Sequence, residues 1–383
     1  MGVRRPSLLR RVAGEESAVR RLDGLMLVAV AGLCVIGTLL VWSSTRTWAP
    51  GSTGLVKKHL LNEVIGVVLC GVVAMVDHRA MRAYAPLVFL VSLIGLGLVL
   101  TPLGATINGS HSWILLGGGF AVQPSEFAKV GLVLVIAMLL AQPAEGTDRP
   151  RGLDLALALI AALFTMGLVM LQPDLGTAMV LAVITASGLI IAGVRKRWIG
   201  ALALVAAAGI FAVFYFQMLE PYQVARFTAF VDPNVDPRGV GYNSTQSMIA
   251  IGSGQLLGKG LLGGGQTTGR FVPEQHTDFI FTVAGEEFGF LGSVTVVLLL
   301  GVVLLRGLQI ARRCEDRFGT LVAGMIVCWF AFQTFINVGM TIGIMPITGL
   351  PLPFVSYGGT ATFANLIAVG MLQAIKMRRQ SFN

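Results

Sequence analysis

Stretches of about 20 mostly apolar residues, each long enough to cross a lipid bilayer, recur along almost the whole chain. The 383-residue sequence is 55% hydrophobic and only 12% charged, which leaves too few polar side chains to cover a water-soluble globule. Only helices and closed barrels satisfy their backbone polar groups inside a membrane. The long apolar runs therefore predict an all-α, multi-pass membrane protein and exclude a soluble enzyme.

Turn residues between the apolar runs divide the chain into about ten membrane helices. We expect these helices near residues 24–44, 60–76, 83–101, 125–141, 153–170, 175–193, 199–217, 278–305, 319–341 and 358–375. The expected organisation is one transmembrane domain (24–375) between a basic N-terminal tail (1–23) and a basic C-terminal tail (376–383). A long loop, at about 218–277, separates the seventh and eighth helices.

Positive charge is distributed unequally between the two sides of this predicted bundle. If the N-terminus is cytoplasmic, twenty Lys and Arg residues lie on the inner side, seven lie on the outer side, and Lys129 falls within a helix. The positive-inside rule therefore places both termini in the cytoplasm and the long loop outside. The net charge of +9 is spread over short inner loops, so nucleic acid is not an expected partner.

Glu126 and Lys129 lie at the outer end of the fourth predicted helix, where ionisable residues are costly to bury. Their i, i+3 spacing puts them on one helix face, where they can form an ion pair. Ser125 is a candidate N-cap for this helix. We favour a polar wall of a substrate cavity over a purely structural cap and pair.

Two aspartates are candidates at the outer ends of later helices. Asp174 stands between two apolar runs, and we favour its interpretation as the N-cap of the sixth helix. Asp278 stands at the outer mouth of the eighth helix, where Thr277 could serve as the cap. A carboxylate with an apolar run behind it is partly desolvated, which raises its pKa and suits it to act as a general base.

Deeper carboxylates and a glycine-rich segment complete the candidates. Glu286 and Glu287 are expected to close a polar network or to bind a cation. The run Gly252–Gly260 lacks the spacing and the Ser or Thr of a phosphate-binding P-loop, so an ATPase is rejected. Its glycines instead suit close backbone approach to a membrane surface or a ligand, with Lys259 available to a phosphate. No zinc site is expected from the scattered histidines.

Four segments in this order resemble the SEDS family of bacterial cell-wall polymerases, which includes RodA and FtsW. They are QPSEFAK (123–129), QPDLGT (172–177), EQHTDFIF with the following GEE (274–287), and PLPFVSYGG (351–359). The likeness extends from about residue 24 to residue 375. Ser112 departs from many relatives, which carry a basic residue just before the tryptophan that Trp113 matches. Gln255 and Thr360 also stand where Gly and Ser are frequent.

This resemblance implies a peptidoglycan glycosyltransferase that joins lipid II units into β-1,4-linked glycan on the outer face of the bacterial cytoplasmic membrane. It makes Asp278 the candidate catalytic base and assigns Glu126, Lys129 and Asp174 to the central cavity. Trp113 matches an aromatic of an outer-loop motif and is a candidate for substrate binding. Ser356, within the fourth motif, is a further candidate for substrate binding. Positive charge for the leaving diphosphate is expected from Lys129, Arg226 and Lys259, or from a divalent cation, Mg²⁺ or Mn²⁺, near Asp278, Glu286 and Glu287.

The resemblance also implies partners and a cellular role. A class B penicillin-binding protein transpeptidase is the expected partner, together with other membrane proteins of the elongation complex. Gly241-Tyr242-Asn243 and the short tails resemble RodA, the elongation member, more than FtsW. The competing hypothesis is a lipid II flippase or other transporter that uses intramembrane carboxylates as proton relays. A non-catalytic scaffold is a third hypothesis, under which Asp278→Ala would leave function intact.

Overall fold

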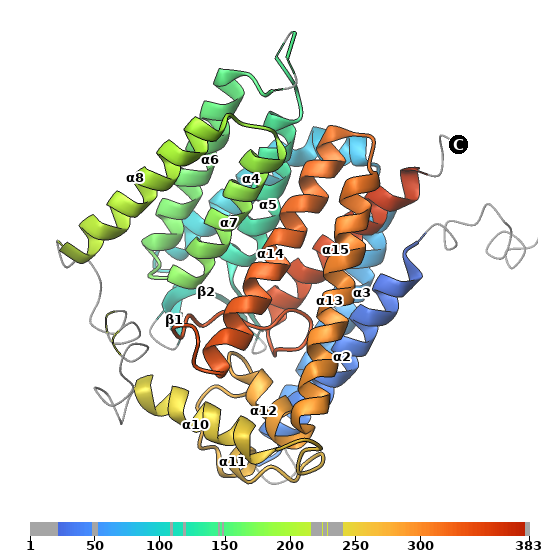
Figure 1. Ribbon diagram of the computed structural model, residues 1–383, viewed down its shortest axis with the longest axis vertical. Helices are drawn as coiled ribbons and strands as arrows, with labels where there is room; N and C mark the ends of the chain where they lie inside the picture. The colour runs from blue at the N-terminus through green and yellow to red at the C-terminus, as the bar shows by residue number, and fades with distance from the viewer. Residues whose placement is uncertain are drawn as a thin grey trace, which may run out of the picture.

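The protein is an α-helical bundle in which long helices run side by side (Figure 1). The structure, a computed structural model, describes residues 22–47, 53–107, 110–117, 120–144, 146–147, 149–215, 224, 228 and 240–379. The long helices in these residues are α2 (Gly24–Thr45), α3 (Gly54–Met75), α4 (His78–Val99), α5 (Pro124–Leu140), α6 (Gly152–Met170), α7 (Leu175–Ile191), α8 (Lys196–Tyr215), α13 (Gly289–Arg313), α14 (Arg317–Thr341) and α15 (Gly359–Arg379). Each of the ten expected membrane helices thus has a counterpart, and seven of the described helices are long and apolar enough to cross a membrane.

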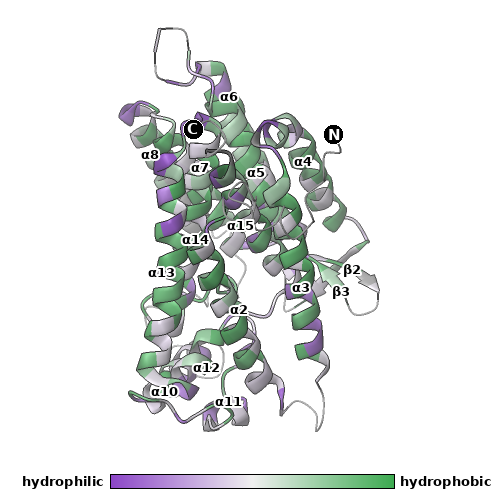
Figure 2. Cartoon of the chain, turned by 90° about the vertical axis from the view of Figure 1, so that its right-hand side faces the viewer, coloured by the Kyte–Doolittle hydropathy of each residue, from purple (hydrophilic) through white to green (hydrophobic). Residues whose placement is uncertain are grey.

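Helix α5 forms the centre of the bundle and packs against α4, α6, α7, α14 and α15. Nearly all of its side chains are buried, including the charged ones. Apolar side chains of the outer helices face outward instead, such as Val28 on α2 and Val91 on α4. Figure 2, in which each residue is coloured by hydropathy, shows hydrophobic residues along the lengths of the helices, as expected for helices in contact with lipid.

The helix expected at 278–305 is broken, which corrects the prediction. Its first part is the short helix α12 (Ile280–Glu287), and α13 starts at Gly289. Gly289 has a φ of +65°, a left-handed conformation that favours glycine. A Cβ atom there would also overlap the backbone of Gly258 in the preceding loop. Hydropathy alone missed the break because both parts are apolar.

The second expected helix also differs from its prediction, because α3 begins at Gly54 and not near residue 60. Hydropathy identifies only the apolar part of a helix, whereas Lys57 and Lys58 are good helix formers that extend it toward the outer side. This extension places Lys58 on a regular helix.

The predicted outer end carries the short elements of the fold. The described part of the loop before α12 contains α10 (Val240–Ser253) and α11 (Gly265–Gly269), and both lie with α12 at the end of the bundle away from the C-terminus (Figure 1). A small antiparallel sheet with strand order β1-β2-β3 follows α4, and no strand was expected from the sequence. Its strands are β1 (Gly104–Ile107), β2 (Ser110–Gly117) and β3 (Phe120–Val122).

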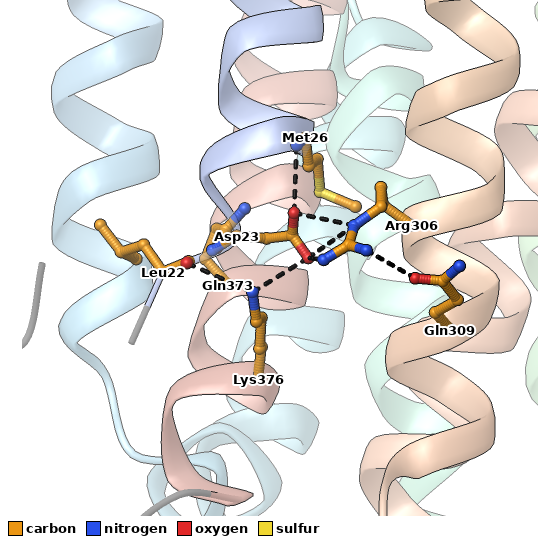
Figure 3. Close-up of polar contacts among 7 residues, drawn as sticks. All are labelled: Leu22, Asp23, Met26, Arg306, Gln309, Gln373 and Lys376. Atoms are coloured by element: carbon orange, nitrogen blue, oxygen red, sulfur yellow. Dashed lines mark hydrogen bonds and ion pairs between the residues drawn. The ribbon is translucent and has the colours of Figure 1, made fainter. Parts of the chain in front are cut away.

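At the opposite end, one carboxylate ties three helices together (Figure 3). Asp23, which is 1% exposed, caps α2 through the backbone N–H of Met26. It accepts hydrogen bonds from Arg306 of α13 at 2.7–3.0 Å and pairs with Lys376 of α15 at 3.1 Å. Gln373 of α15 accepts a hydrogen bond of 2.7 Å from the Asp23 N–H. The first and last helices of the bundle therefore meet on the same side.

We expect Asp23→Asn to lower the unfolding temperature, because asparagine keeps the helix cap but loses both ion pairs. Burial raises the pKa of the Asp23 carboxyl, but the bonds from Arg306, Met26 and Lys376 outweigh it and hold the pKa below its ordinary value. The charged Asp23 carboxylate therefore stabilises the folded protein at neutral pH, and this stabilisation is lost as the pH falls below about 4. The expected loss is roughly 2 kcal/mol, measured by thermal unfolding in detergent at pH 7.

Asp316→Asn is the matched control for this prediction. Asp316 caps α14 by accepting a hydrogen bond of 3.1 Å from the Gly319 N–H. Because asparagine caps helices as well as aspartate does, this variant is expected to unfold near the native temperature. Equal shifts in the two variants would show that loss of the Asp23 ion pairs adds nothing to the effect of replacing a capping aspartate by asparagine.

Candidate active site

A cavity of about 600 Å³ is lined by residues from the predicted outer end of the bundle. Its walls come from α3, the sheet, the start of α5, the Pro173–Thr177 region, the turn before α12, and the segment that precedes α15. The volume lies in the range of small-molecule sites in proteins. The cavity brings together predicted site residues from four separate parts of the sequence, namely Trp113, Glu126, Asp174 and Asp278.

Asp278 lies on a tight turn and not inside a helix. The backbone N–H groups of Thr277, Asp278 and Phe279 all donate to the carbonyl oxygen of Glu274. The buried side chain of Asn337, on α14, donates to the carbonyl oxygens of Asp278 (2.8 Å) and Leu350 (2.7 Å). The Asp278 side chain is half-buried and lines the cavity, so a carboxylate is held in a fixed place beside apolar packing.

The expected cap by Thr277 is wrong, because the Thr277 hydroxyl donates instead to the backbone and side chain of Glu274. His276, on the same turn, is buried, and its ring lies 5.6 Å from that of Tyr357. Burial lowers the pKa of His276, although the charge of Glu274 opposes this shift. Burial therefore favours the uncharged form of this imidazole, two residues before Asp278.

Glu126 and Lys129 form the predicted ion pair, with 2.7 Å between Lys129 Nζ and Glu126 Oε2. Glu126 lines the cavity and is 2% exposed, whereas Lys129 is fully buried behind it, with its Nζ 4.9 Å from the centre of the Trp329 ring. Ser125 does not cap α5, because the helix begins at Pro124 and Gln123 occupies the cap position. The negative member of the pair thus faces the cavity, and the positive member faces the core.

Asp174 is the N-cap of α7, as predicted, and also lines the cavity. Its carboxylate accepts hydrogen bonds from the Thr177 N–H (2.9 Å), the Thr177 hydroxyl (2.7 Å) and the Gln123 side chain (3.1 Å). The bond from Gln123 ties α7 to the start of α5. Asp174 therefore combines the structural role favoured from the sequence with a place on the cavity wall.

Trp113 also lines the cavity, from strand β2, whereas Ser356 and Lys259 do not. The Ser356 hydroxyl is buried and accepts a hydrogen bond of 2.8 Å from the Leu352 N–H, which closes the turn before Tyr357. Lys259 pairs with the buried Glu286 at 2.8 Å, away from the cavity residues. Arg226 lies outside the described residues.

The predicted divalent cation does not fit Glu286 and Glu287. The Glu286 carboxylate is already occupied by Lys259 and by backbone and hydroxyl donors of Gln266 and Thr267. Glu287 accepts a hydrogen bond from the Ser43 hydroxyl of α2. Within the described ranges, no three His, Cys, Asp or Glu residues are grouped closely enough to hold a metal ion.

Several cavity residues were not singled out from the sequence. Lys58 of α3 is the one Lys or Arg among the described residues that line the cavity, and Asn62 lies one turn further along the same helix. Glu274, His276 and Tyr357 also contribute to the wall. The motifs around Asp278 and Ser356 contained the last three, whereas Lys58 was counted only as a positive charge outside the membrane.

This architecture defines a class of protein: a multi-pass membrane protein with a carboxylate-lined cavity open toward one face. The chain belongs to the FtsW, RodA and SpoVE family of cell cycle proteins, whose sequence model matches residues 24–381. The predicted SEDS family and the multi-pass helical fold are confirmed.

Named relatives are similar to this chain over nearly its whole length. Stage V sporulation protein E of Bacillus subtilis is 36% identical, over 91% of this chain and 95% of the relative. Peptidoglycan glycosyltransferase MrdB of Escherichia coli K12 is 34% identical, over 94% of each protein. A probable peptidoglycan glycosyltransferase FtsW of Aliivibrio salmonicida is 37% identical, over 89% of this chain and 85% of the relative.

Solved structures resemble the fold over the same length. A chain from a peptidoglycan synthase complex that coordinates polymerisation and crosslinking superposes with a TM-score of 0.77, at 29% identity, over 94% of this chain and 98% of that one. The rod shape determining protein RodA of Thermus thermophilus has a TM-score of 0.67, at 27% identity, over 94% of this chain and 97% of that one. The likeness therefore extends over the complete bundle.

Proposed function

We propose that this peptidoglycan glycosyltransferase polymerises lipid II into β-1,4-linked glycan strands, with Asp278 as the general base. The activity itself follows from family membership and from relatives named as peptidoglycan glycosyltransferases. The observation that carries the assignment of Asp278 is its position on the wall of the cavity that also contains Glu126, Asp174, Trp113 and Lys58.

The chemistry needs one displacement at the donor sugar. The acceptor hydroxyl attacks the anomeric carbon, a new C–O bond forms, and the bond to the diphosphate breaks, so that undecaprenyl diphosphate leaves. An α-linked donor and a β-linked product require inversion, and inversion needs a base but no covalent sugar intermediate. Asp278 accepts the proton of the acceptor hydroxyl in this scheme.

Lys58 is the candidate to stabilise the charge on the leaving diphosphate. Neither Lys129 nor Lys259, the other candidate cations in the described residues, lines the cavity. Lys58 is half-buried and lines the same cavity as Asp278. A cation aimed at developing phosphate charge in a partly water-excluded site contributes strongly to rate.

We expect Lys58→Met to lower the rate of glycan synthesis by about 10²-fold, the size of effect seen when one charge-stabilising group is removed. Methionine keeps the length and the apolar stem of lysine and removes only the charge. Lys57→Met is the control, because Lys57 is exposed on the same helix turn and does not line the cavity. The rate is measured as consumption of lipid II, and equal losses in both variants would argue against a specific role for Lys58.

The structure does not favour binding of a divalent cation by Glu286 and Glu287. Glu286 and Glu287 have other partners, so Mg²⁺ or Mn²⁺ would have to be held by the substrate diphosphate together with Asp278 or another cavity carboxylate. No step of the proposed chemistry depends on the cation. Comparing lipid II consumption in EDTA with that in added Mg²⁺ or Mn²⁺ decides whether one is required.

We further propose that the chain works in the bacterial cytoplasmic membrane with a class B penicillin-binding protein and other elongation-complex proteins. The structural likeness to a chain of a peptidoglycan synthase complex supports such a partner. The likeness to RodA supports the elongation role, although relatives named for sporulation and for FtsW are about equally identical in sequence. Depletion of the protein should therefore produce rounded cells and not filaments.

The decisive experiment is polymerisation of purified lipid II by the detergent-purified chain, alone and with a partner penicillin-binding protein whose transpeptidase is blocked. Glycan strands are the expected product. If no glycan forms but the chain moves lipid II across liposome membranes, the transporter hypothesis replaces the polymerase. If neither activity appears, a scaffold for the partner becomes the better explanation.

A further inference from the structure

Glu286 is a completely buried carboxylate that the proposed chemistry does not use. One oxygen accepts a hydrogen bond of 2.8 Å from Lys259 Nζ and another of 2.9 Å from the Gln266 N–H. The other accepts from the Thr267 N–H and the Thr267 hydroxyl, each at 2.8 Å. Every one of these donors belongs to the loop that precedes the turn of Asp278 (274–278), called the catalytic turn. Glu286 therefore fastens this loop to the end of α12.

The backbone reinforces the same junction. The N–H groups of Lys259 and Gly260 donate to the carbonyl oxygens of Glu286 and Glu287, each at 3.0 Å. Gly258 has a φ of +79°, and a Cβ there would overlap the Glu287 carbonyl oxygen. The glycine-rich segment thus lets the loop approach the α12–α13 break. This explains glycines that the sequence had suggested for contact with a membrane surface or a ligand.

Thr267 continues the connection toward the catalytic turn. Its carbonyl oxygen accepts a hydrogen bond of 2.9 Å from the side chain of Gln275. Thr267 and Gln275 are each 3% exposed, so water does not compete for this bond. Gln275 lies on the turn 274–278, three residues before Asp278. Three buried side chains therefore connect the end of α12 to the residue proposed as the base.

We propose that Glu286 is a positioning residue that holds the turn of Asp278 in place through Thr267 and Gln275. The inference rests on the proposed function only in treating Asp278 as the base. Asn337 holds the Asp278 carbonyl oxygen from the membrane side, and the Glu286 connection holds the turn from the loop side. Misplacement of a catalytic group by about 1 Å costs roughly 10²-fold in rate, so the orientation of this turn matters for catalysis.

Glu286→Gln and Gln275→Met cut the connection at its two ends. Glu287→Gln is the control, because Glu287 is a neighbouring buried carboxylate that accepts hydrogen bonds from Ser43 of α2 and from the backbone of Leu262 and Gly264, whereas Thr267 donates to Glu286. Hydrogen exchange of the 274–279 peptide, followed by mass spectrometry on detergent-purified protein, reports the turn directly. We expect exchange about tenfold faster in Glu286→Gln and Gln275→Met, and unchanged in Glu287→Gln.

Kinetics with lipid II provide the second readout. In Glu286→Gln and Gln275→Met we expect kcat to fall about tenfold while KM stays near the native value, because the reacting geometry changes and substrate binding does not. Glu287→Gln should keep the native kcat even if it unfolds at a lower temperature. A merely structural role of Glu286 predicts equal effects of Glu286→Gln and Glu287→Gln on the unfolding temperature, on exchange and on kcat.

The two readouts separate this inference from the proposed function. Unchanged exchange in Gln275→Met, which leaves the contacts of Glu286 intact, would overturn the connection even if Glu286→Gln fails to fold. Faster exchange with an unchanged kcat would overturn the catalytic importance of the turn. If the native chain makes no glycan but exchange responds as expected, the connection stands and the assigned reaction is wrong.

Discussion

Asp278→Asn is expected to lower the rate of glycan synthesis by about 10²- to 10⁴-fold, the usual contribution of a positioned general base. Asparagine has the same shape as aspartate but cannot accept the proton of the acceptor hydroxyl. The Asp278 carbonyl oxygen, which Asn337 binds at 2.8 Å, is unchanged by the substitution, so the turn should keep its conformation. The measurement is the initial rate of lipid II consumption by purified protein with its partner, with thermal unfolding as the check on folding.

Glu274→Gln provides the comparison for Asp278→Asn. Glu274 is a second carboxylate on the same turn that also lines the cavity, and it is more exposed than Asp278. We expect a loss of less than about tenfold, because an exposed charge is screened by water. If Asp278→Asn polymerises lipid II at the rate of the native protein, Asp278 is not the base. Glu126 and Asp174 then become the next candidates.

Much of the fold could be predicted because the membrane leaves few alternatives. Length and hydropathy identified each long helix in the part of the chain that the structure describes, and local rules gave the Asp174 cap and the Glu126–Lys129 pair. Those rules operate within a few residues of sequence, so they need no knowledge of the tertiary structure. The family resemblance also singled out Asp278 and Trp113, and both line the same cavity.

The remaining features depend on contacts between distant segments. The helix break at Gly289 is set by the backbone of Gly258 in another loop, which no local pattern reveals. Lys259 was predicted to bind phosphate, but its partner is Glu286, 27 residues later. Lys58 was overlooked because its place depends on α3 extending beyond its apolar part. The charge on a side chain is visible in the sequence, whereas the partner of that charge is not.

The Glu126–Lys129 pair yields the largest expected effect on stability. Lys129 is completely buried between Glu126 and the Trp329 ring, so Lys129→Met leaves the Glu126 carboxylate buried without its cation. Removing one partner of a buried ion pair costs about 3–5 kcal/mol, because the remaining charge has lost its compensation. We expect a clearly lower unfolding temperature for Lys129→Met and loss of glycan synthesis, since Glu126 lines the cavity.

The double variant Glu126→Gln/Lys129→Met tests this explanation. Glutamine removes the uncompensated charge, so the double variant should unfold at a higher temperature than Lys129→Met alone, which is the non-additivity expected for two groups in contact. Glycan synthesis should remain low, because the cavity wall has then lost its carboxylate. A double variant less stable than Lys129→Met would instead show that the two residues stabilise the core independently, through packing against α14 and not through their mutual attraction.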